Sequence, residues 1–168
     1  RTAKQVLEHY PSMDYKGLEL TPRMAKLANE KLASFANAKV VQADALHDQW
    51  PSPEFDRILA FYVLDIFTEN EIKLFLKTCK ERLSSSGKVV FVSITEPSGD
   101  SAPFSAKAVM GAWNAISNVA PIILGGCRPL RLTTYLDDLW DVEHSEIVSV
   151  LGYTSEIIVA SQQQESRI

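Results

Sequence analysis

The stretch YKGLELTPRMAKLANEKL, from Tyr15 to Leu32, decides the fold. Its first residues form a short apolar run that predicts a strand over Tyr15 to Leu20, with the acidic Glu19 at its tip. Thr21 is a favourable N-cap, and Pro22 suits the first position of a helix. The apolar residues that follow recur at helical spacing: Met24, Leu27, Ala28, Leu32 and Phe35. The stretch therefore predicts a strand that turns directly into a helix.

The same alternation continues on both sides of this stretch. Helices are predicted over Thr2–Tyr10 and Glu69–Leu83, and strands over Lys39–Ala43, Lys88–Thr95 and the run Phe55–Phe67, which leaves the sheet near Phe61. The segment SSSGK is predicted to be a turn in which Gly87 ends the second of these helices. Long apolar strands that alternate with helices indicate an α/β fold. We expect a Rossmann-like, mostly parallel sheet with helices on both faces.

The pattern changes after Thr95. A further helix is predicted over Phe104–Val119 and a short one over Thr133–Trp140, with the loop LGGCRPL between them. The runs HSEIVSVL and TSEIIVAS, separated only by Gly152 and Tyr153, predict a closing antiparallel β-hairpin. We expect a single domain over residues 1–161, with a cap over about residues 103–140 and a disordered tail over residues 162–168.

The bulk composition is that of an ordinary globular protein. The 168 residues carry a net charge of -4 and no block of Lys or Arg, which argues against a nucleic-acid partner. No apolar run approaches the roughly 20 residues that a membrane span needs, so we expect a cytoplasmic protein. The two cysteines, Cys79 and Cys127, suggest neither a metal site nor a disulfide framework, and Cys79 falls on the apolar stripe of its helix.

Acidic residues end two consecutive predicted strands, Glu19 at the first and Asp44 at the second. In open α/β sheets ligands bind at the carboxyl ends of the strands, and an acid at such a place hydrogen-bonds ribose hydroxyls about 20 residues after a glycine-rich loop. Counted back from Glu19, that loop would precede Arg1, so we expect residues upstream of it. Taken singly, Glu19 could also be a solvated strand-end charge, and Asp44 a turn residue that caps the next segment.

Several pieces together resemble a class I S-adenosylmethionine-dependent methyltransferase: GLELTPRMAKLANEKL, VVQADA, FDRILAFYVLDIF and LKTCKERLSSSGKVVFVS. The ending VSVLGYTSEIIVAS is similar to the closing hairpin of that family, and it favours an adenosyl-type methyl donor over NAD. The resemblance covers roughly Arg1 to Ser161, without the family's first strand and glycine-rich loop. It implies S-adenosyl-L-methionine as cofactor and S-adenosyl-L-homocysteine as product.

The resemblance also implies a set of cofactor-binding residues at three strand ends: Glu19, Leu20, Thr21, Met24, Asp44, Ala45, Leu46, Ala60 and Phe61. Glu19 would accept hydrogen bonds from the ribose hydroxyls, and Asp44 from the adenine amino group. Ionised carboxylates are strong acceptors for such donors. Ala60 and Phe61, after the next strand, would lie under the methionine end of the cofactor.

Methyl transfer to a small apolar or aromatic molecule, by in-line attack on the cofactor methyl group, is the implied reaction. Its main requirement is orientation of the acceptor. A general base is needed for some acceptors, and the candidates are Tyr62, Asp65, Glu96 and His144. Many relatives carry His where this chain has Asp65. The candidates for contact with the acceptor are Tyr62, Met110, Trp113 and Arg128.

Two other functions stay open at this point. The first is a methyltransferase-like module that binds ligands without catalysis. The second is an NAD-dependent dehydrogenase, which the closing hairpin disfavours. Binding of S-adenosylhomocysteine compared with NADH separates the dehydrogenase from the other two.

Overall fold

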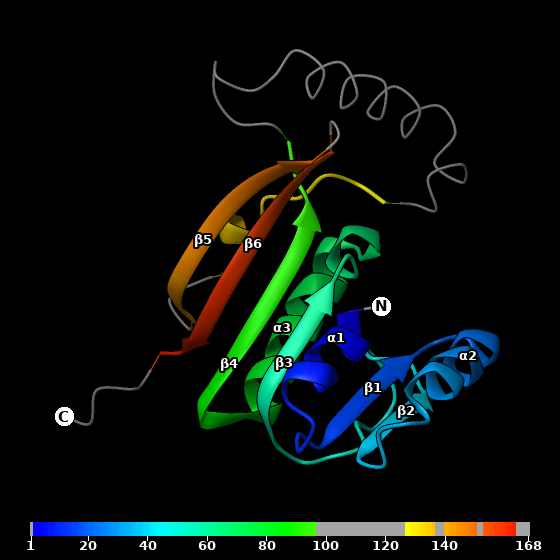
Figure 1. The fold of residues 1–168 in the computed structure, drawn as a ribbon. Helices are drawn as coiled ribbons and strands as arrows, with labels where there is room; N and C mark the ends of the chain where they lie inside the picture. Colours follow the sequence, from blue (N-terminus) through cyan, green and yellow to red (C-terminus); the bar gives the residue numbers. More distant parts are fainter. Residues whose placement is uncertain (1, 97–126, 137–139, 151–152, 164–168) are drawn as a thin grey trace. The chain divides into compact units, whose positions relative to one another are not determined.

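The computed structural model describes residues 2–96, 127–136, 140–150 and 153–163 (Figure 1). The chain divides into two units, residues 1–53 and residues 54–168. The first unit contains α1 (Thr2–His9), β1 (Tyr15–Glu19), α2 (Pro22–Leu32) and β2 (Ala38–Gln42). The second contains β3 (Phe55–Phe61), a 3-10 helix (Leu64–Ile66), α3 (Glu69–Arg82), β4 (Leu83–Ile94), a second 3-10 helix (Leu132–Thr134), β5 (Trp140–Val150) and β6 (Tyr153–Gln162).

The first unit confirms the strand–turn–helix prediction. β1 and β2 pair in parallel, with Tyr15 opposite Ala38 and Glu19 opposite Gln42. The helix α2 packs on both strands and buries Ala25. Because parallel strands end at the same edge, the residues after Glu19 and after Gln42 come together at one end of this strand pair.

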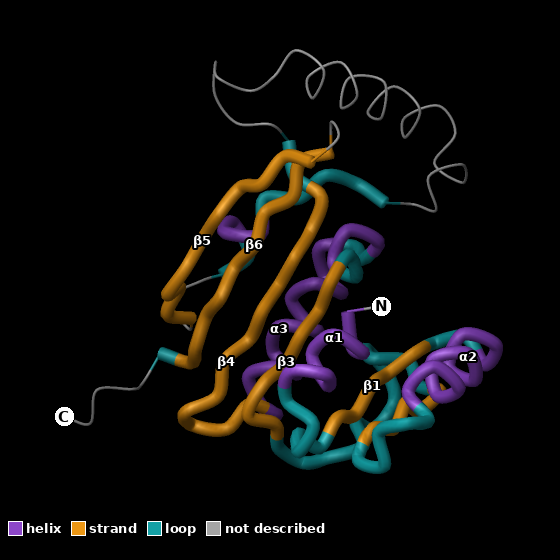
Figure 2. The backbone as a smooth tube through the Cα atoms, in the orientation of Figure 1, coloured by secondary structure: helices purple, strands orange, loops and turns teal. Residues whose placement is uncertain are grey.

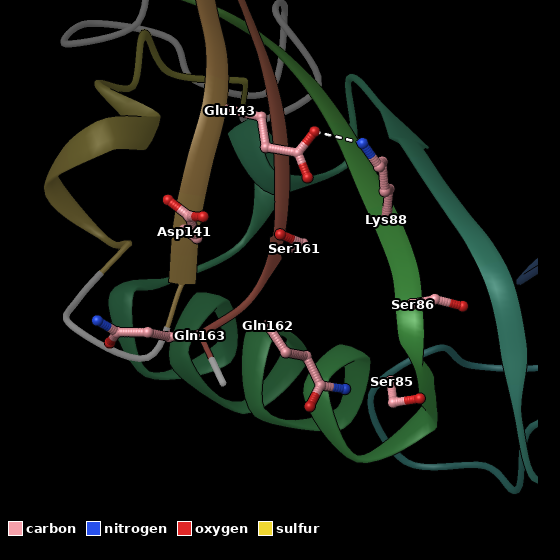
Figure 3. A pocket seen from close by; sticks show the side chains of 8 residues that line it. All are labelled: Ser85, Ser86, Lys88, Asp141, Glu143, Ser161, Gln162 and Gln163. Carbon is pink, nitrogen blue, oxygen red and sulfur yellow. Dashed lines mark hydrogen bonds and ion pairs between the residues drawn. The ribbon is translucent and has the colours of Figure 1, made fainter. Parts of the chain in front are cut away.

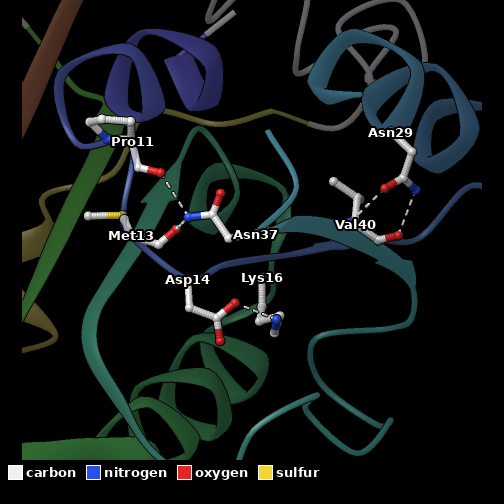
Figure 4. Close-up of polar contacts among 7 residues, drawn as sticks. All are labelled: Pro11, Met13, Asp14, Lys16, Asn29, Asn37 and Val40. Atoms are coloured by element: carbon white, nitrogen blue, oxygen red, sulfur yellow. Dashed lines mark hydrogen bonds and ion pairs between the residues drawn. The ribbon is translucent and has the colours of Figure 1, made fainter. Parts of the chain in front are cut away.

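Two asparagines that the sequence did not single out stabilise this unit (Figure 4). Asn29 Nδ2 donates to Val40 O at 2.8 Å, and Val40 N donates to Asn29 Oδ1 at 2.9 Å. The amide of Asn29 thus satisfies backbone groups of β2 that β1 does not reach, which protects the edge of this strand. Asn37 Nδ2 donates to Pro11 O at 3.0 Å and also to Met13 O. Asn37 thus ties the segment before β1 to the start of β2.

The second unit contains a mixed four-stranded sheet in the order β3-β4-β6-β5 (Figure 2). β3 and β4 are parallel, whereas β6 is antiparallel to both β4 and β5. The α/β class and the closing hairpin are confirmed. This four-stranded sheet is mixed rather than mostly parallel, because two of its three strand pairs, β4–β6 and β6–β5, are antiparallel.

The core of this unit lies between α3 and one face of the sheet. The Phe75 and Phe91 ring centroids are 6.5 Å apart, and those of Phe91 and Trp140 are 6.2 Å apart. Cys79 is fully buried on the inner face of α3, which confirms its assignment to the core. A capping box between Thr68 and Glu71 fixes the start of α3.

The predicted turn at SSSGK is wrong. α3 ends at Arg82, and β4 starts at the next residue, without a glycine stop. The sheet register passes from Phe55 opposite Leu83 to Arg57 opposite Lys88, so residues 84–87 form a bulge in β4. A Cβ atom on Gly87 would lie 2.6 Å from Leu83 Cγ and 2.9 Å from Ser84 O. The glycine is needed for this close approach and not to end the helix.

Other predictions after Thr95 also need correction. The short helix predicted over Thr133–Trp140 is wrong in its described part, since only Leu132–Thr134 form a 3-10 turn and Trp140 already begins β5. Gln162, assigned to the tail, is the last residue of β6, and its Nε2 donates to Lys80 O and Leu83 O, each at 2.8 Å. The helix predicted over Phe104–Val119 lies outside the described residues.

Candidate functional site

The structure brings Glu19 and Asp44 to the carboxyl ends of two adjacent strands. Glu19 is the last residue of β1, and its carbonyl oxygen accepts from Ala43 N at 3.0 Å. Glu19 Oε1 accepts from Thr21 N at 3.0 Å and from Thr21 Oγ1 at 2.9 Å. Thr21 occupies the predicted N-cap position of α2, but its side chain orients the carboxylate and makes no capping hydrogen bond. Among the described residues, none donates to Glu19 Oε2.

The loop after β2 is held by its own hydrogen bonds. Asp44 Oδ1 accepts from Leu46 N at 2.8 Å, and Asp44 N donates to Asp48 Oδ2 at 2.7 Å. The buried indole of Trp50 donates to Ala45 O at 3.0 Å. Asp44 is therefore a turn residue, as its alternative reading expected, and it still presents its second carboxylate oxygen at the strand end.

Two apolar side chains next to Glu19 are exposed. Leu20 is 64% exposed and Met24 is 53% exposed. Both stand in the turn and first helical residues after β1, where the resemblance implies that Leu20 flanks the sugar and Met24 lies nearby. Exposed apolar side chains beside convergent acceptors are typical of a small-molecule site.

The end of β3 carries a strained residue. Ala60 is buried and Phe61 partly buried, and the next residue, Tyr62, has a φ of 54°. This left-handed conformation costs about 1 kcal/mol for a side chain of this size. Tyr62 N donates to Val92 O at 2.7 Å, and the hydroxyl of Tyr62 lies 3.1 Å from Ser155 Oγ. Strain of this kind is often found at functional sites.

Asp65 is an internal acceptor and has no exposed surface. Its Oδ1 accepts from Ser93 Oγ at 3.0 Å, its Oδ2 from Ile94 N at 3.2 Å, and its carbonyl from Arg128 N at 3.0 Å. Burial raises the pKa of Asp65, and the hydrogen bonds from Ile94 and Ser93 oppose that rise only in part. Asp65 thus joins the segment after β3 to the end of β4 and to the loop at Arg128.

The remaining candidates lie in different places. His144 lies in β5 opposite Val159 of β6, and Val159 pairs in turn with Val90 of β4. Because β4 ends at Ile94, His144 lies four residues away from the carboxyl end of β4. Its Nε2 is 3.5 Å from Glu146 Oε2. Glu96 follows β4 and is exposed. Met110 and Trp113 lie outside the described residues.

Arg128 lines a hollow of about 540 Å³ beside the carboxyl end of β3. Its Nη2 donates to Phe67 O at 2.9 Å. The other lining residues form the segment between β3 and the first turn of α3: Ile66, Phe67, Thr68, Glu69 and Asn70. The sequence suggested Arg128 for a pocket rim and missed these partners, although Ile66 and Phe67 follow directly on the predicted exit from the sheet.

A second hollow, of about 380 Å³, lies at the amino end of β4 (Figure 3). Lys88 forms an ion pair there with Glu143, the residue at a bulge in β5. Hydrogen bonds from Lys88 and Ser161 hold the pKa of Glu143 below its usual range. None of the residues suggested by the sequence reaches this hollow.

The described residues give no sign of a metal centre, because no three His, Cys, Asp or Glu side chains among them are grouped to hold an ion. In the same residues, no helix combines the length and the apolar character needed to cross a membrane.

Solved structures with this fold are numerous. The chain matches PhzM, a pyocyanin biosynthetic protein, with a TM-score of 0.70 and 22% identity over 96% of this chain and 46% of that one. It matches the N-methyltransferase NodS from Bradyrhizobium japonicum WM9 with a TM-score of 0.64 and 14% identity, over 89% and 66% of the two chains. It matches LepI with a TM-score of 0.70 and 13% identity, over 97% and 40%. The chain thus spans about half of PhzM and less of LepI.

The family comparison is more specific than these matches, whose low identities show the fold alone. No curated protein matches the chain. A family model described as a methyltransferase domain matches residues 1–87, which include both acidic strand ends and run into the bulge of β4. The chain belongs to this methyltransferase domain family, and the resemblance to class I S-adenosylmethionine-dependent methyltransferases is confirmed.

Proposed function

We propose that this chain binds S-adenosyl-L-methionine and transfers its methyl group to a small apolar or aromatic acceptor. The observation that carries the proposal is the pair of carboxylates, Glu19 and Asp44, at the ends of adjacent parallel strands. Membership of the methyltransferase domain family supports the reaction type. NodS and LepI, solved in complex with S-adenosylhomocysteine, support the cofactor.

The residues present fit the nucleoside part of this cofactor. The ribose offers two neighbouring hydroxyl donors, and Glu19 keeps one carboxylate oxygen unused while Thr21 holds the other. The adenine amino group is a donor, and Asp44 presents a carboxylate from a loop that is already ordered by hydrogen bonds. The exposed side chains of Leu20 and Met24 offer apolar contact to the sugar and the ring.

The cofactor supplies an activated methyl group on a sulfonium, so the chain's own residues have to bind and orient. Tyr62 is the candidate for contact with the acceptor. It is 52% exposed, and its hydroxyl is held by Ser155 at the end of the sheet. Asp65 is buried and satisfied, and His144 lies in mid-strand, so we give neither of them the role of general base.

Calorimetric titration of S-adenosylhomocysteine into the full chain tests the proposal. Glu19→Ala should weaken binding about 100-fold, because it removes an ionised acceptor of two hydroxyl groups. Asp44→Asn should weaken it about tenfold, since the amide keeps one acceptor oxygen for the turn. Glu30→Gln is the matched control, because Glu30 is an exposed acid on α2 and forms only a 4.0 Å ion pair with Lys26.

Equal affinity in the Glu19→Ala variant and in the control would overturn the proposed site. NADH titrated in parallel should not bind, and preference for NADH would favour a dehydrogenase. Binding of S-adenosylhomocysteine without methylation of any aromatic acceptor would favour a non-catalytic module.

A further inference from the structure

The hollow beside Arg128 lies at the carboxyl end of the parallel strands of the second unit, and two segments of backbone border it. One wall is the segment from Ile66 to Asn70, which leaves β3 and starts α3. The other is the segment of residues 128–130, called the strap below. In it, the backbone N–H of Arg128 donates to Asp65 O at 3.0 Å. Two residues on, Leu130 N donates to Ile94 O at 2.7 Å and ties the strap to the end of β4. These two backbone hydrogen bonds fix the position of the Arg128 backbone, from which the side chain extends.

The charge of Arg128 is not compensated by the described residues. Its guanidinium donates one hydrogen bond, from Nη2 to Phe67 O, and no acidic side chain in the described part of the chain forms an ion pair with it. A guanidinium has five N–H donors in a planar fork, and the described residues accept from one of them. Arg128 is partly buried, and its charge gains from an anionic partner more than a fully solvated charge would.

The rest of the hollow combines apolar and polar groups. Ile66 is 52% exposed and Phe67 partly exposed, so both offer apolar surface. Asn70 adds an amide that can donate or accept. Glu69 opposes an anion, but it lies in the first turn of α3, where the positive end of the helix dipole partly offsets its charge. The volume of about 540 Å³ is that of a small-molecule site.

We infer that this hollow recognises a carboxylate on the methyl acceptor, which is therefore an aromatic or apolar carboxylic acid. Arg128 binds the carboxylate through two parallel N–H groups, a geometry that suits a guanidinium better than an ammonium. Ile66 and Phe67 contact the apolar body. The inference rests on the proposed methyltransferase function and deepens it, since it names the chemical class of the acceptor.

The test uses 1-naphthoate and the neutral 1-naphthalenemethanol as probes, titrated into the full chain without cofactor and followed by NMR. The wild-type chain should bind naphthoate more tightly than the alcohol. Arg128→Met should weaken naphthoate binding about 10- to 100-fold and leave the alcohol unchanged. Glu69→Gln should strengthen naphthoate binding a few-fold, because it removes the one acidic side chain among the described residues that line the hollow.

Equal naphthoate affinity in wild type and Arg128→Met, or no preference for naphthoate over the alcohol in wild type, would overturn the inference. If Arg128→Met fails to fold, Ile66→Glu decides. Ile66 is half exposed, so a glutamate is tolerated there, and its charge should abolish naphthoate binding. Unchanged naphthoate binding by Ile66→Glu would again overturn the inference.

Titration of S-adenosylhomocysteine into the same samples separates the two proposals. Loss of cofactor binding with naphthoate binding intact would count against the proposed function alone. Intact cofactor binding with no naphthoate binding would count against the carboxylate site alone.

Discussion

The two hollows of the second unit lie at opposite ends of β4 and differ in how their charges are compensated. At the amino end, Lys88 forms an ion pair with Glu143 (Figure 3). Gln162 Nε2 donates to the backbone carbonyls of Lys80 and Leu83. At the carboxyl end, the Arg128 side chain has one carbonyl partner among the described residues, and Tyr62 has a left-handed backbone. The described lysine at the amino end thus has an acidic partner, whereas the arginine at the carboxyl end has none among the described residues and lies near a strained backbone.

This difference teaches how to separate a structural polar cluster from a binding site of similar size. Polar groups that satisfy each other stabilise the fold and gain little from a ligand. Donors without partners, held in place by a rigid backbone, gain most from one. In open α/β sheets ligands bind at the carboxyl ends of the strands, and that is the end with the unused donors.

The largest effect is expected at Asp65, which supports the carboxyl end. Asp65→Ala leaves Ser93 Oγ and Ile94 N buried without their acceptor, which should lower the free energy of unfolding by about 3 kcal/mol. Asp65→Asn keeps one acceptor oxygen and should cost about 1 kcal/mol. Urea unfolding followed by circular dichroism measures both. A loss below about 0.5 kcal/mol for Asp65→Ala would show that these bonds do not support this end.

Asp65 also predicts a pH dependence with a definite sign. Burial raises its pKa in the folded chain above the ordinary 3.8, so the folded state holds this proton more tightly than the unfolded state. The stability contributed by Asp65 is therefore complete below about pH 3.8 and falls as the pH rises through the raised pKa. The Asp65→Asn variant lacks this term. The wild-type chain should lose stability relative to it between acid and neutral pH, and parallel pH profiles would contradict the assignment.

A smaller effect is expected from Gly87, at the satisfied end. Gly87→Ala places a Cβ atom 2.6 Å from Leu83 Cγ and 2.9 Å from the backbone oxygen of Ser84. The bulge of β4 must shift, which should cost about 2 kcal/mol in urea unfolding. Affinity for S-adenosylhomocysteine and naphthoate should not change. Ser86→Ala, at an exposed neighbour in the same bulge, is the control and should be nearly neutral. A change in ligand affinity for Gly87→Ala would break the comparison between the two ends.

The residues show which of these features a sequence can predict. The helix after Thr21, the acid at each strand end and the pairing of β5 with β6 as a hairpin follow from local patterns of periodicity and turn chemistry, and they were predictable. The bulge at Gly87 was not, because it depends on the register of β4 against β3 and on the close approach of Gly87 to Leu83 and Ser84. The hollow of Arg128 also depends on a long-range contact, from Arg128 to Phe67. No local pattern marks such a contact.

The strain at Tyr62 predicts a difference of about 1 kcal/mol between two variants. Tyr62→Val and Tyr62→Asn both remove the phenol and its contact with Ser155. Asparagine tolerates a φ of 54° and valine does not, so the valine variant should be the less stable one. Thermal unfolding of the two variants measures the difference. Equal stabilities of the two variants would show that the backbone at Tyr62 is not strained, and this difference between the two ends of β4 would no longer hold.

The smallest effect is expected from Lys88→Met, because the ion pair that it removes is partly exposed to solvent, with side-chain exposures of 40% and 34%. At neutral pH the midpoint of urea unfolding should stay almost unchanged. The pKa of Glu143, followed by NMR, should rise toward its ordinary value of 4.5, because the Lys88 hydrogen bond is the first cause of its lowering. Because the pKa of Glu143 is lowered in the folded chain, the stability that Glu143 contributes is present above its ordinary pKa and is lost as the pH falls. In acid, the wild-type chain and the variant should therefore have the same stability.

The same variant leaves the Glu143 carboxylate without its lysine partner at the amino end, away from the carboxyl ends of β3 and β4. If the Lys88→Met variant binds a small ammonium probe about as tightly as the wild-type chain binds naphthoate, an uncompensated charge is sufficient for binding. If the variant does not bind the probe, the backbone hydrogen bonds around Arg128 are required as well.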